Sequence, residues 1–154
     1  MRVTYWLGYL AICLLLVGHS VAQADPRISY LLYCGGCHLP DGTGAPPEVP
    51  SLHEDLGRIV KLQGGREYIV RVPGASQAPV SDRELAEILN WILFAFNAAT
   101  LASDFSPLTE SEVTAARDDV LADPLKYRAQ LWQRYEEKLV SSYQKAEDEA
   151  ENHR

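Results

Sequence analysis

The sequence predicts an all-α fold, in which a small helical core is followed by a helical extension at the C-terminus. Apolar residues recur at three- and four-residue spacing in the stretches 26–37, 84–96 and 125–143, as they do on one face of an α-helix. The segment 40–50 holds two glycines and four prolines and is therefore predicted to be irregular. Helices that bracket one loop-rich segment are typical of a small helical domain.

Residues 1–24 are predicted to be a secretory signal peptide that is cleaved before Asp25. Arg2 lies in a short n-region, an apolar stretch covers 6–17, and Ala22-Gln23-Ala24 has the small-x-small cleavage pattern. An apolar stretch of about 12 residues is too short to cross a bilayer core of about 30 Å at about 1.5 Å per residue. Cleavage predicts a periplasmic protein, and the alternative is a segment retained as a membrane anchor.

The core, expected over residues 25–98, contains two predicted helices. The first covers 26–37, with Ile28, Leu31 and Leu32 on one face. The stretch 56–72 is ambiguous between a short helix and turns, because Gly64-Gly65 interrupts it. The second helix begins with a predicted capping box in which Ser81 is the N-cap and Glu84 the N3 residue. Its apolar face consists of Leu85, Ile88, Leu89, Ile92 and Phe96.

Residues 99–154 are expected to form an acidic helical extension. A turn at 106–109 precedes a helix over 110–121, which ends near Asp123-Pro124. The apolar residues at helical spacing in the next helix are Leu131, Trp132, Tyr135, Leu139 and Tyr143. This stripe either packs on the core, which we favour, or binds a partner or a second copy. The polar stretch 145–154 is expected to fray.

A Cys-x-x-Cys-His motif, formed by Cys34, Cys37 and His38, predicts a covalently attached c-type haem. Both thiols are spaced to bond one porphyrin, and the imidazole then serves as an axial iron ligand. A thioredoxin-type site would need a βαβ pattern that residues 25–75 lack. A zinc site would need a second ligand pair, which His53 and His153 do not supply. A disulfide or a metal site remains the alternative to haem.

Acidic side chains exceed basic ones in both parts of the exported chain. The net charge is −3 over residues 25–98 and −5 over residues 99–154. This balance argues against nucleic acid or an anionic membrane surface as a partner and favours a partner with a basic surface.

Beyond the motif, residues 27–97 resemble a class I cytochrome c domain. The residues that carry the resemblance are Tyr30 and Tyr33 before Cys34, Asp41-Gly42-Thr43-Gly44 after His38, Pro50-Ser51-Leu52, and the helix 84–96 with Trp91. The resemblance implies a small all-α fold around one haem. It also implies that the Pro50 carbonyl accepts a hydrogen bond from Nδ1 of the axial His38, which orients the ring and raises its basicity. Residues 99–154 lie outside it.

The sequence departs from that family at the sixth iron ligand. The family has a methionine shortly before its last helix, whereas the one methionine of this chain is Met1. Ala78, which precedes Pro79, most resembles the missing methionine, with a register uncertain by two or three residues. The weak candidates for a replacement are Gln77, His53, Lys61, His153 and the α-amine of Asp25. A ligand from another chain and an open iron site are the remaining alternatives.

Two functions from different classes follow. The first, which we favour, is one-electron transfer by a periplasmic c-type cytochrome, either as a carrier or as the haem subunit of a dehydrogenase complex. Its redox partner would be a periplasmic dehydrogenase or another cytochrome. The second is a five-coordinate haem protein that binds a diatomic gas, as a sensor or a weak peroxidase. Because no motif assigns a distal histidine–arginine pair, we expect no enzyme. A structural or assembly subunit is a third option.

Overall fold

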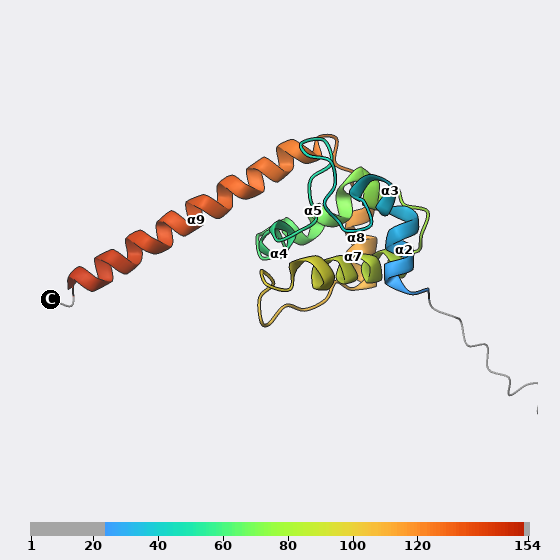
Figure 1. Cartoon of the computed structure of the whole chain (residues 1–154). Helices are drawn as coiled ribbons and strands as arrows, with labels where there is room; N and C mark the ends of the chain where they lie inside the picture. Colours follow the sequence, from blue (N-terminus) through green and yellow to red (C-terminus); the bar gives the residue numbers. More distant parts are fainter. Residues whose placement is uncertain (1–23, 153–154) are drawn as a thin grey trace, which may run out of the picture.

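The computed structural model describes residues 24–152 and shows an all-α fold, as predicted (Figure 1). Residues 1–23 of the predicted signal peptide and the candidate ligand His153 lie outside the described residues. The helices are α2 (Pro26–Tyr33), α3 (Gly35–His38), α4 (Asp55–Ile59), α5 (Gly65–Arg71), α6 (Pro73–Ser76), α7 (Asp82–Asn97), α8 (Glu110–Arg117) and α9 (Pro124–Asn152). No strand occurs in this part of the chain, in which Ala45 and Val49 form an isolated bridge. None of the described helices is both long and apolar enough to cross a membrane.

Helix α7 packs against α2 and holds it through Glu84. The Ser81 hydroxyl caps α7 by accepting a hydrogen bond from the Glu84 amide at 3.2 Å. The predicted capping box is only half formed, however, because the Glu84 carboxylate does not return to Ser81. It accepts a 2.7 Å hydrogen bond from the hydroxyl of Ser29, which is buried on α2. Glu84, which we expected to cap its own helix, therefore links α7 to α2.

An aromatic cluster fills the contact between α2 and α7. Tyr30 is fully buried, with its ring centroid 5.0 Å from Trp91 and 5.7 Å from Phe96. Its hydroxyl donates a hydrogen bond to the Leu39 carbonyl just after α3. Burial of the phenol raises the pKa of Tyr30 to about 12. This buried phenol thus fastens the end of the Cys-x-x-Cys-His motif to the core.

The extension is packed into the same core by α8. Val113 and Leu108 are buried there with residues of α5 and α7. Helix α8 begins with a complete capping box, in which the Thr109 hydroxyl accepts from the Glu112 amide and the Glu112 carboxylate accepts from the Thr109 amide. We did not predict this box, although its sequence spacing matches that of Ser81 and Glu84.

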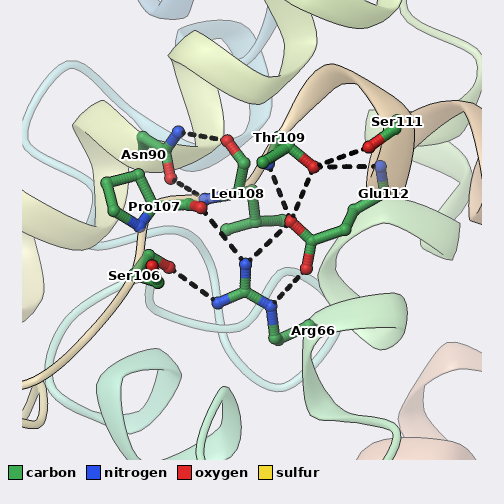
Figure 2. A network of polar contacts seen from close by, with 8 residues as sticks. All are labelled: Arg66, Asn90, Ser106, Pro107, Leu108, Thr109, Ser111 and Glu112. Carbon is green, nitrogen blue, oxygen red and sulfur yellow. Dashed lines mark hydrogen bonds and ion pairs between the residues drawn. The ribbon is translucent and has the colours of Figure 1, made fainter.

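Arg66 of α5 joins the core to the segment before α8 (Figure 2). It pairs with Glu112 at 2.7 Å and donates to the carbonyls of Ser106 and Pro107 at 2.9 and 3.3 Å. The hydrogen bonds from Arg66 are the main reason why the pKa of Glu112 falls to about 2. Asn90 of α7 also connects the core to this segment. Its side chain donates a hydrogen bond to the Leu108 carbonyl and accepts one from the Leu108 amide.

Helix α9 divides into a packed first part and a projecting second part. Leu131 is fully buried, and Tyr127 stacks on Tyr68 of α5 with ring centroids 5.9 Å apart. Beyond these turns, the helix extends away from the body of the protein (Figure 1). Leu139, Val140 and Tyr143 are 38, 55 and 69% exposed there. The helix continues to Asn152, so it includes most of the polar stretch that we expected to fray.

Candidate functional site

The Cys-x-x-Cys-His motif forms a short helical turn at the end of α2. Cys34 closes α2 through a 2.8 Å hydrogen bond from its amide to the Tyr30 carbonyl. The amides of Cys37 and His38 then donate to the Cys34 carbonyl at 3.2 and 3.0 Å. This turn places all three side chains in the wall of one cavity of about 450 Å³.

The two thiols lie in different environments. Cys34 is half-buried and Cys37 is exposed. Burial, and then the proximity of Cys37, raise the pKa of the Cys34 thiol to about 11. Thiol–disulfide exchange catalysts have a lowered cysteine pKa instead. The raised pKa of Cys34 therefore differs from that of a thiol–disulfide exchange catalyst. No group of three or more His, Cys, Asp or Glu side chains in residues 24–152 is placed to hold a metal ion.

His38 presents an imidazole with a buried and unpartnered nitrogen. Its Nδ1 makes no well-formed hydrogen bond within the described chain. The Pro50 carbonyl is nevertheless close enough to oppose the effect of burial, which lowers the pKa of the ring. The structure therefore brings the predicted pair His38 and Pro50 together.

A glycine turn positions the Pro50 carbonyl. Gly44 has a φ of +67°, which favours glycine, and its amide donates to the His38 carbonyl at 3.0 Å. A Cβ at Gly44 would lie 2.5 Å from the Val49 carbonyl oxygen and 2.9 Å from that of Pro50. The close approach of these three residues fixes the loop 44–50 beside the imidazole.

The rest of the cavity is mainly apolar. Helix α7 contributes one broad wall, made of Leu85, Ile88, Leu89, Ile92 and Leu93. Segment 68–75 contributes Tyr68, Ile69, Val72, Gly74 and Ala75. Two thiols and one imidazole at the edge of an apolar cavity are the donor set and the environment that a covalently attached haem requires. The residues present therefore fit the predicted cofactor.

None of the weak candidates for the sixth ligand that the structure describes lines this cavity. Gln77 is exposed, and His53 hydrogen-bonds to the Asp41 carbonyl while its ring packs on Phe96. Lys61 and Asp25 are exposed as well. The structure also bears on which residue occupies the position of the family's methionine, since Ala75 lines the cavity whereas Ala78 does not. Of the two alanines, Ala75, three residues before Ala78, is therefore the one that faces the cavity.

Sequence reasoning missed two parts of the cavity. Tyr68 lies in a stretch that we left ambiguous, and it is a buried wall residue. The N-terminal turns of α9 supply Pro124, Leu125 and Arg128, and Arg128 pairs with Asp55 at 2.8 Å. No local pattern distinguishes these residues from an ordinary surface helix, because their role depends on long-range packing.

Two curated proteins are similar to this chain, and no family model matches it. One cytochrome c-552 of Thermus thermophilus is 34% identical over 122 residues, which cover 68% of this chain and 82% of the relative. A second cytochrome c-552 of Thermus thermophilus is 33% identical over 113 residues, 62% of this chain and 86% of the relative. Residues 1–98 make up less than two thirds of the 154 residues, so the first match extends past residue 98.

Proposed function

Because this chain belongs to the class I, monohaem c-type cytochromes, which bind haem c covalently and transfer electrons rather than catalyse a reaction, we propose that it is a periplasmic one-electron carrier or the haem subunit of a dehydrogenase complex. In this proposal Cys34 and Cys37 form the two thioether bonds, and His38 is an axial iron ligand. The Pro50 carbonyl orients the imidazole. The observation that carries these assignments is the convergence of both thiols and the half-buried imidazole on one apolar cavity.

The protein's contribution to electron transfer is to set the environment of the cofactor. The bound haem supplies the reversible one-electron chemistry. The apolar wall of α7 excludes water and so disfavours the more highly charged oxidation state. The Pro50 carbonyl increases the basicity of His38, which has the opposite effect on the potential. Cys37 lies at the exposed rim of the cavity, where a redox partner is able to approach closely.

Gas binding is the second candidate function. It is supported by the segment 72–75, which contributes only Val72, Gly74 and Ala75 to the cavity. None of these side chains is able to bind iron. Tyr68, another residue of the cavity wall, does carry an oxygen donor.

An absorption spectrum of the mature protein in both oxidation states, with and without CO, separates the two functions. We expect haem to be retained after acid–acetone extraction. Sharp low-spin ferrous bands that CO leaves unchanged would support electron transfer. Extractable haem would refute the covalent assignment to Cys34 and Cys37. A broad ferrous spectrum that shifts when CO is added would instead support gas binding and refute electron transfer as the function.

We further propose that the projecting part of α9 binds the redox partner. Leu139, Val140 and Tyr143 expose apolar surface, and the segment 146–152 carries four acidic residues and no basic one. A partner that offers an apolar groove beside basic side chains, such as a periplasmic dehydrogenase or another cytochrome, complements both features.

Deletion of residues 136–154 is the test of this docking surface. Of the described residues that it removes, 136–152, none is buried, and the fully buried Leu131 remains. We expect unchanged haem content and thermal stability, and at least a tenfold slower reduction of the ferric protein by a periplasmic extract of the source cells. Deletion of 147–154 alone is expected to remove mainly the salt dependence of that rate. An unchanged rate after the longer deletion would disprove docking through α9.

A further inference from the structure

The segment that connects α5 to α7 is the part of the fold in which the family has its sixth ligand. It runs from Val72 through α6 to Ser81 and contains both Ala75 and Ala78. Its own hydrogen bonds are local, such as those from the Gln77 amide to the Pro73 carbonyl and from the Ala78 amide to the Ala75 carbonyl. A segment whose own hydrogen bonds are all local needs contacts with other parts of the fold to keep one position beside a cavity.

Arg117, the last residue of α8, provides such an anchor. Its Nε donates to the Ser76 carbonyl at 2.8 Å, and its Nη1 donates to the Val80 carbonyl, also at 2.8 Å. Its Nη2 donates to the Ala78 carbonyl. One guanidinium thus binds three alternate carbonyls of the segment, and its side chain is only 15% exposed.

An ion pair holds the guanidinium itself in place. Nη1 of Arg117 lies 2.8 Å from Asp82, the first residue of α7. The other Asp82 oxygen accepts a 2.6 Å hydrogen bond from the Thr114 hydroxyl, one turn earlier on α8. Hydrogen bonds from Thr114 and then Arg117 lower the pKa of the Asp82 carboxyl. Contacts with α7 and α8 therefore hold the guanidinium in addition to its bonds to the segment.

The preceding end of the segment is fastened to the extension as well. The Leu121 amide donates to the Arg71 carbonyl at 3.0 Å, and the Arg71 side chain reaches both the carbonyl and the carboxylate of Asp119 at 2.7 Å. Residues after position 98 thus hold this segment at both ends.

We infer that Arg117 is a positioning residue. By binding segment 76–80 it keeps the preceding Ala75 in the wall of the haem cavity, and it takes over the restraint that an iron–methionine bond gives this segment in the resembled family. A planar guanidinium offers five donors, enough for three carbonyls and a carboxylate together, whereas an ammonium has three donors and no fork. With the segment fixed, Ala75 stays in the cavity wall and Gln77 stays outside it. The inference rests on the proposed haem site.

The test compares Arg117→Leu, Arg117→Lys and a control, Arg83→Leu, in the haem-loaded protein. Arg83 pairs with Glu110 across the same α7–α8 contact, but this pair is 70 and 52% exposed and touches no carbonyl of the segment. Two quantities are measured: amide hydrogen exchange at Gln77, Ala78 and Val80, and the rate at which imidazole binds the ferric protein. Haem content after extraction monitors the proposed site independently.

We expect at least tenfold faster exchange at these three amides and at least tenfold faster imidazole binding in Arg117→Leu. Arg83→Leu is expected to leave both rates within twofold of the wild type. Arg117→Lys retains the charge beside Asp82, so it should recover thermal stability while exchange in the segment stays fast.

Three results would overturn the inference. The first is an amide exchange rate at Gln77, Ala78 and Val80 that equals the wild-type rate in either Arg117 variant. The second is faster exchange throughout the protein with no additional increase at these three amides. The third is an unchanged rate of imidazole binding despite faster exchange at these amides. If Arg117→Leu does not fold, Arg117→Lys provides the same comparison. Loss of covalent haem from the wild-type protein would instead refute the proposed function.

Discussion

Methionine at position 75 is expected to raise the reduction potential of this protein by on the order of 100 mV, a fraction of the range over which axial ligands tune haem. Ala75 lines the cavity, so a flexible thioether placed there extends into it. Thioether ligation stabilises ferrous iron. Potentiometric titration measures the shift, and the charge-transfer band of thioether-bound ferric haem identifies the ligand.

Ala78→Met is the matched control for this substitution. Both alanines are buried, at 9 and 8% exposure, but Ala78 does not line the cavity and its carbonyl is bound by Arg117. We expect this variant to leave the potential unchanged and to lose about 1–3 kcal/mol of unfolding free energy through overpacking. A raised potential in Ala78→Met but not in Ala75→Met would contradict this expectation. Position 78 would then correspond to the family's methionine, as the sequence resemblance favours.

These two alanines show what sequence reasoning can and cannot establish here. That Cys34, Cys37, His38 and Pro50 line one cavity could be expected from a motif and from the family resemblance. Helix α7 was predictable because its apolar face is periodic and its N-cap is strong. Which alanine faces the cavity depends instead on α6, a single turn whose orientation is set by Arg117, more than thirty residues later. No local pattern contains that information.

The same reasoning explains the uncertainty about residues 56–72. Gly64-Gly65 reads as a break in a helix, and it is one, since α4 ends before it and α5 begins at Gly65. The structure adds the reason why Gly65 has no side chain: a Cβ there would lie 1.8 Å from the Ile59 carbonyl oxygen. That close approach brings the start of α5 against the end of α4, and Tyr68 of α5 lies in the cavity wall. A sequence shows the glycine but not the carbonyl that it meets.

The role of the extension was the least predictable feature. Its composition suggested an acidic appendage, and we favoured packing of the α9 stripe on the core without knowing where that packing would end. Tyr127 and Leu131 are packed and Tyr143 is not. The difference arises because Tyr68 is available to stack on Tyr127, while the body of the protein ends before it reaches Tyr143. Helical periodicity is identical on both sides of that boundary.

Gly44→Ala is expected to cost about 2–4 kcal/mol of unfolding free energy and to raise the reduction potential. The alanine Cβ would meet the Val49 and Pro50 carbonyls at 2.5 and 2.9 Å, in a backbone conformation with φ at +67°. The positive φ alone costs about 1 kcal/mol or more for a residue with a side chain, and the clash adds to this cost. Urea unfolding of the haem-loaded protein measures the loss.

Potentiometric titration of the same variant reports the second effect. Displacement of the Pro50 carbonyl weakens the hydrogen bond that we propose for Nδ1 of His38, so the imidazole becomes less basic and stabilises ferric iron less. Gly36→Ala is the control, since a Cβ there has no atom within 4 Å other than those of its chain neighbours and of the backbone of its own helix; it should change neither quantity. A stability loss in Gly44→Ala with an unmoved potential would mean that Pro50 shapes the loop without orienting His38. Because one turn holds both the loop and the carbonyl, the two effects should instead appear together.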